Sequence, residues 1–103
     1  MAKIIPQSIS KNEREKLKNY LFTEIAQLSD KKTTEEFFSG LLTESETLML
    51  IRRLQIAKML LDGHTYFDIR KALGVGYENI KSVRLNTDNG SEEFIKFIKK
   101  LKV

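Results

Sequence analysis

The chain of 103 residues contains no cysteine and a single proline, Pro6. Without cysteine it can form no disulfide bond, no thiolate metal site and no cysteine nucleophile, and it suits a reducing compartment. A long hydrophobic run is also lacking at the start of the chain. The first ten residues contain only the apolar pair Ile4-Ile5, which is too short for a signal sequence or a membrane span. We therefore expect a cytoplasmic protein without a membrane anchor.

Alternation of apolar and polar residues, the pattern of a β-strand, is absent as well. Apolar residues recur instead at intervals of three and four, which indicates helices. The length suits one domain, and 41% hydrophobic with 31% charged residues is ordinary for a soluble globular protein. We expect one all-α domain over residues 1–103, with residues 1–9 forming a flexible N-terminal arm.

Six helices are predicted, each beginning at a side chain that can cap unpaired backbone N–H groups. They cover residues 11–28, 34–42, 43–62, 65–73 and 76–86, with a last helix after Ser91 whose apolar face reaches Leu101. Thr33 with Glu36 is the expected cap of the second helix. Residues 87–90 are expected to form a turn.

The apolar faces of these helices predict how the chain packs. The third helix is apolar on nearly every side, so it should lie at the centre. The first helix carries a long stripe, and the last a shorter one formed by Phe94, Phe97, Ile98 and Leu101. The stripe of the first helix either packs on the third helix of the same chain or meets a partner helix, and a homodimer is the leading interpretation.

Residues 65–86 have the proportions of a helix-turn-helix. Gly74 supplies the left-handed residue that the tight turn needs, and Val75 fills the corner. The inner faces of the two helices are predicted to be formed by Ile69, Leu73, Ile80 and Val83.

A local excess of basic residues falls on this motif, in a chain whose net charge is +4. Asn79 can pair with adenine, Lys81 with guanine or a phosphate, and Arg84 with a phosphate. Glu78 either accepts a hydrogen bond from cytosine or turns away as a first-turn charge. The predicted DNA-contacting residues are Thr65, Tyr66, Arg70, Lys71, Gly76, Tyr77, Glu78, Asn79, Lys81, Ser82 and Arg84.

Enzymatic and metal sites find little support in the sequence. His64 is the only histidine and follows Gly63 at a helix end, where a cap or a solvated side chain is the ordinary role. Glu44 and Glu46 stand at the start of a helix, where capping and the helix dipole explain them. We predict no catalytic residue and no metal ligand.

Three segments resemble the trp repressor family, particularly its trp-repressor-related bacterial members. They are residues 41–46, residues 59–63 with the helix that they end, and residues 69–76, where Arg70 stands at a place that this family also fills with a long basic residue. The resemblance implies a repressor-type, sequence-specific transcriptional regulator that acts as an intertwined homodimer on double-stranded DNA. Its two recognition helices would lie roughly 34 Å apart.

The resemblance also implies a pocket for a small effector. In trp repressor, tryptophan lies between an arginine of the central helix and one of the recognition helix. Arg53 and Thr43 match the central-helix positions, whereas the second arginine is replaced by Ser82. We therefore expect no cofactor and weak or no binding of tryptophan, and we leave open whether the pocket takes another small effector. The alternative function is a helical protein-interaction or dimerisation module without specific DNA binding.

Overall fold

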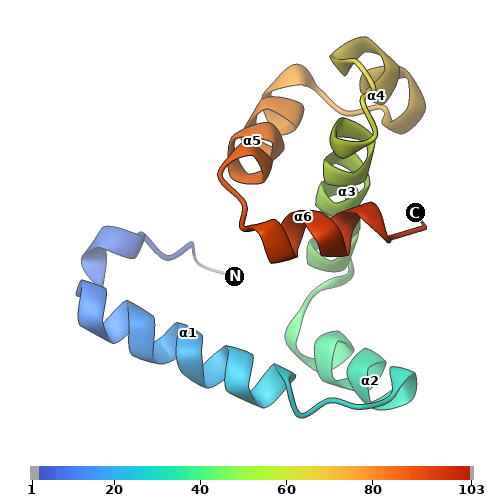
Figure 1. Ribbon diagram of the computed structural model, residues 1–103. Helices are drawn as coiled ribbons and strands as arrows, with labels where there is room; N and C mark the ends of the chain where they lie inside the picture. Colours follow the sequence, from blue (N-terminus) through green and yellow to red (C-terminus); the bar gives the residue numbers. More distant parts are fainter. Residues whose placement is uncertain (1–2, 103) are drawn as a thin grey trace. The chain divides into compact units, whose positions relative to one another are not determined.

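The computed structural model describes residues 3–102, and every regular element in that range is helical (Figure 1). The elements are the 3-10 turn η1 (Pro6–Ser8), α1 (Lys11–Ile25), α2 (Lys31–Leu41), α3 (Glu44–Leu61), α4 (Tyr66–Leu73), α5 (Tyr77–Asp88) and α6 (Glu92–Lys99). The predicted all-α class is confirmed. Two compact units meet in the sequence between Leu41 and Leu42. The first contains η1, α1 and α2, and the second contains α3 to α6.

Helix α1 begins where the sequence predicts and ends earlier. The Ser10 hydroxyl accepts a hydrogen bond from the backbone N–H of Glu13, but the helix stops at Ile25, short of residue 28. Tight i to i+3 hydrogen bonds of Gln27 and Leu28 replace the last predicted turn. No residue of α1 is buried, and Tyr20 is 68% exposed.

Helix α2 begins three residues before the predicted start, and Asp30 rather than Thr33 caps it. The Thr33 backbone N–H donates to Asp30 Oδ1 at 2.7 Å, and the Thr33 hydroxyl donates to Asp30 Oδ2 at 3.0 Å. The predicted pairing of Thr33 with Glu36 was therefore wrong. Both residue types can cap a helix, but the aspartate carboxylate accepts both hydrogen bonds and leaves Thr33 as the donor.

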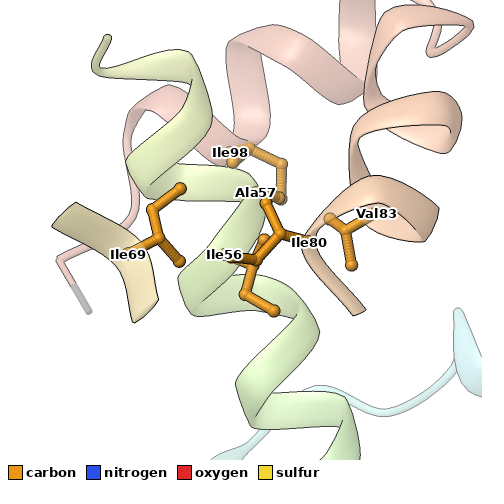
Figure 2. Packing of buried hydrophobic residues seen from close by; sticks show 6 residues of the cluster. All are labelled: Ile56, Ala57, Ile69, Ile80, Val83 and Ile98. Carbon is orange, nitrogen blue, oxygen red and sulfur yellow. The ribbon is translucent and has the colours of Figure 1, made fainter. Parts of the chain in front are cut away.

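The core of the second unit is built around the C-terminal half of α3 (Figure 2). Ile56 and Ala57 of α3 meet side chains from all three later helices, and the cluster is completed by Ile69, Ile80, Val83 and Ile98. The central position predicted for α3 holds for this half only. Up to Leu54, the helix leaves a row of apolar side chains 38–55% exposed, namely Leu48, Met49, Leu50, Ile51 and Leu54.

A polar contact beside the core also holds helix α6 against α3. The Lys58 ammonium donates to the Lys99 carbonyl oxygen at 2.6 Å and lies 3.2 Å from the Asp62 carboxylate. A cation at the C-terminal end of a helix also interacts favourably with the helix dipole. Ile98 of α6 is buried as predicted, whereas Phe97 is 63% exposed and does not join the core.

Helix α5 continues through Asp88, although residues 87–90 were predicted to form a turn. Thr87 is 4% exposed, and its hydroxyl donates to the Val83 carbonyl at 2.8 Å. This bond satisfies the threonine inside the helix, so its preference for turns is overridden by burial. No helix within residues 3–102 combines the length and the apolar character needed to cross a membrane.

The turn after α4 depends on a backbone conformation that side chains disfavour. Gly74 has φ 69° and ψ 24°, the left-handed geometry predicted for it. Gly76 has φ −82°, which suits any residue, and an added Cβ there would meet no atom within 4 Å. The two glycines therefore differ in what a substitution would cost.

We predict that Gly74→Ala lowers the free energy of unfolding by about 1–2 kcal/mol, the cost of placing a side chain in the left-handed region. Urea denaturation followed by circular dichroism measures it. Gly76→Ser is the matched control and should cost nothing, because a serine can cap α5. Equal losses in the two variants would contradict the assigned role of Gly74.

Helices α3 and α4 each begin at a capping box. Thr43 and Glu46 exchange hydrogen bonds at the start of α3, and Thr65 and Asp68 do the same at the start of α4, both as predicted. Donation from the Thr43 and Thr65 backbone N–H groups lowers the pKa of Glu46 below 4.5 and the pKa of Asp68 below 3.8. The ionised carboxylates therefore stabilise the folded chain.

Since these folded-state pKa values are depressed, the stabilisation is present above about pH 4.5 and is lost as the pH falls through the folded-state values. We predict that Glu46→Gln and Asp68→Asn each reduce the loss of unfolding free energy on acidification, since an amide oxygen still accepts a hydrogen bond but does not titrate. Urea denaturation at a series of pH values measures the slope. An unchanged slope in both variants would contradict the prediction.

Candidate nucleic-acid interface

Helices α4 and α5 form a helix-turn-helix within the second unit. Ile69 and Ile80 are fully buried, and Val83 is 9% exposed. Leu73 and Val75 are partly buried against the same cluster. The predicted inner faces and the corner residue are thus confirmed. With its inner side fixed on the core, α5 can present only its remaining exposed surface to a partner.

The exposed surface of the motif carries both charge signs, with four cations against the acids Asp68, Glu78 and Asp88. The exposed cations are Arg70 and Lys71 in the last turn of α4 and Lys81 and Arg84 on α5. At the start of α5, Gly76 provides no side-chain cap, so the first N–H groups point outward without a side-chain acceptor. Glu78 lies in this first turn, where the helix dipole favours a carboxylate.

All the predicted DNA-contacting residues are solvent-accessible, with Tyr66 half-buried and the others exposed. They do not all face the same surroundings. Asn79 and Ser82 line a hollow between α3 and α5, together with Arg53. Lys81 and Arg84 are not among the residues that line it.

Two arginines stack on tyrosines across the turn. The Arg70 Cζ atom lies 4.3 Å from the ring centroid of Tyr77, and the Arg84 Cζ atom lies 5.6 Å from that of Tyr66. The two rings are 6.2 Å apart with their planes at 33°. The Tyr66 side chain and then the Asp88 carboxylate raise the pKa of Arg84.

Sequence reasoning missed these stacks, although a signal for them exists. Tyr66 and Arg70 are four residues apart on α4, and Tyr77 and Arg84 are seven apart on α5. Each spacing places a tyrosine and an arginine on one face of its helix. Only the angle between the helices decides which arginine meets which tyrosine.

The hollow between α3 and α5 has a volume of about 610 Å³. It brings together Arg53 and Ser82, two of the three residues predicted for an effector pocket, whereas Thr43 is not among its lining residues. The start of α3 contributes Glu44 and Ser45 instead, which sequence reasoning missed. Both charge signs and apolar side chains line the hollow, so it suits a small molecule with polar and apolar parts.

The hollow differs from a two-arginine clamp in one respect. Arg52 and Arg53 line it from α3, while α5 contributes only the neutral side chains of Asn79, Ser82 and Val83. A planar ligand would therefore find a guanidinium on one wall and no guanidinium on the other. Among residues 3–102, no three histidine, cysteine or acidic side chains are grouped as a metal site would require.

Comparisons with known proteins agree with this geometry. The family model described as Trp repressor protein matches residues 15–102. The chain is 32% identical over 74 residues to the uncharacterized protein YerC of Bacillus subtilis (strain 168), covering 72% of this chain and 71% of that protein. No solved structure matches the chain. The chain therefore belongs to the Trp repressor family, and this membership indicates a DNA-binding transcription regulator.

Proposed function

We propose that the chain is a sequence-specific, repressor-type transcriptional regulator that binds double-stranded DNA as a homodimer through α4 and α5. The observation that carries the proposal is the division of α5 into two sides. One side is fixed on the core by Ile80 and Val83, and the remaining surface exposes Lys81 and, beside the buried side, Arg84. A helix held this way can enter the major groove without unfolding any part of the core.

The roles of the side chains follow from their places. Lys81 reaches guanine acceptors or a phosphate, and Asn79 pairs with adenine from the start of α5. Arg84 lies nearly two turns after Tyr77, the first residue of α5, and meets a phosphate. Arg70 and Lys71 of α4 lie where the DNA backbone crosses the first helix of the motif.

A second copy of the chain is the proposed partner of the exposed apolar row on α3. Leu48, Met49, Leu50, Ile51 and Leu54 are consecutive or nearly so, and each is more than a third exposed. A helix with apolar residues on several sides gains stability by burying them. Two-fold assembly would place two copies of α5 for adjacent turns of the DNA.

The competing function is a helical dimerisation module in which the exposed cations of α5 are only solvated. Both functions use the apolar row of α3. They differ in whether affinity for DNA exists and depends on salt, because neutralised phosphates release counterions in proportion to their number.

We predict a steep salt dependence of binding to a duplex site obtained by selection from random DNA. Arg70, Lys71, Lys81 and Arg84 of both protomers would give a slope of log K against log salt near about −7, at about −0.9 for each phosphate. Fluorescence anisotropy over a salt series measures it. A slope near zero would favour the dimerisation module.

Single substitutions on α5 sharpen this test. Lys81→Ala and Asn79→Ala should each weaken binding to the selected site by about tenfold or more. Lys96→Ala is the control, since Lys96 is exposed on α6 and pairs with Glu92 at 3.7 Å. Unchanged binding in both α5 variants would refute the role of α5, and a selected site without two-fold symmetry would refute the homodimer.

We further propose that tryptophan is not the effector of the hollow, because α5 lacks an arginine there. Calorimetry should show no saturable binding of L-tryptophan at micromolar concentration. Ser82→Arg places a guanidinium opposite Arg53 and should raise the affinity for tryptophan, whereas Ser82→Lys, the control, adds charge without a planar group. Micromolar binding to the unmodified chain would contradict the prediction.

A further inference from the structure

The two stacks on the helix-turn-helix are crossed. Arg70 belongs to α4 and lies on Tyr77 of α5, whereas Arg84 belongs to α5 and lies on Tyr66 of α4. With the two rings 6.2 Å apart, the four side chains form a row in the order Arg70, Tyr77, Tyr66, Arg84. We name this row the Tyr–Arg row. It spans both helices, and Tyr66 also packs against the hydrophobic core.

The two ends of the Tyr–Arg row differ in charge compensation. Arg84 Nε lies 3.6 Å from the Asp88 carboxylate. Within residues 3–102, Arg70 forms no ion pair, and its guanidinium lies over the Tyr77 ring. A guanidinium that stacks by its flat face keeps its N–H groups directed outward in its own plane, where they can bind an anion.

Stacking also determines how well Arg70 can bind such an anion. A free arginine side chain samples many rotamers, and binding must select one of them. A ring 4.3 Å from the Arg70 Cζ atom restricts the guanidinium before any ligand arrives. Restricting a group in its binding position raises affinity by reducing the entropy lost on binding.

The position of Arg70 indicates which anion it would meet. Arg70 lies in the last turn of α4, and Tyr77 is the first residue of α5. In a helix-turn-helix on DNA the first helix crosses the backbone while the start of the second enters the major groove. Planar guanidinium groups bind phosphate oxygens in a bidentate manner.

We propose that Tyr77 is a positioning residue that holds the Arg70 guanidinium for a backbone phosphate beside the major groove, with Tyr66 supporting the Tyr77 ring from α4. This inference rests on the proposed DNA-binding function and deepens it. The role of Tyr77 is to supply a ring face, so its hydroxyl group is not required.

The test compares Arg70→Ala, Tyr77→Leu, the double variant and Tyr77→Phe on the selected duplex across a salt series. Arg70→Ala and Tyr77→Leu should each reduce the magnitude of the salt slope by about one per protomer, and the double variant should reduce it no further. Tyr77→Phe keeps the ring and should retain the slope of the unmodified chain. Circular dichroism checks that all variants remain helical.

A second measurement needs no DNA. Nuclear magnetic resonance should show the Arg70 side-chain protons shifted upfield by the Tyr77 ring in the unmodified chain and in Tyr77→Phe, with the shift lost in Tyr77→Leu. Absence of the shift in the unmodified chain would overturn the stack itself.

The outcomes separate this inference from the proposed function. If the unmodified chain shows no salt-dependent DNA binding, the proposed function fails and the phosphate role of Arg70 fails with it. If the unmodified chain binds with a steep slope and Tyr77→Leu keeps that slope while Arg70→Ala loses it, only the positioning role of Tyr77 is overturned. Additive losses in the double variant would also overturn it.

Discussion

The packing of four isoleucines is the interaction on which the rest of the second unit depends. Ile56, Ile69, Ile80 and Ile98 come from four different helices, and each is at most 1% exposed. Full burial of such a side chain contributes about 1.5–3 kcal/mol, whereas an exposed ion pair contributes at most about 1 kcal/mol. The angle between α4 and α5 is therefore set by the isoleucines rather than by the surface ion pairs. The placement of the exposed cations, the hollow and the Tyr–Arg row all follow from that angle.

Features that depend on neighbouring residues could be predicted from the sequence. The capping boxes at Thr43 and Thr65 and the left-handed Gly74 were found because each is decided within a few residues. Prediction failed where two local signals competed, as when Asp30 rather than Thr33 capped α2. It also failed where packing overrode a local preference, as when burial kept Thr87 inside α5.

The candidate site shows the same division. The exposed cations Arg70, Lys71, Lys81 and Arg84 were predicted because helical spacing leaves them outside the buried positions. The hollow and the crossed stacks were not fully predicted, since both depend on how far apart helices lie in space. Asn79 illustrates the consequence, because it belongs to the predicted DNA-contacting residues and also lines the hollow with Ser82. An occupant of the hollow would touch the helix that we propose reads the DNA.

The crossed arrangement of the Tyr–Arg row has a consequence for how this surface can evolve. Each arginine has its ring partner on the other helix. Replacing one tyrosine therefore changes the surroundings of an arginine that lies seven or more residues away in the sequence. Substitutions at positions 70 and 77, and at positions 66 and 84, are therefore expected to accompany one another among relatives. On this face, selection would therefore act on each pair of a tyrosine and an arginine from two helices, rather than on any single side chain.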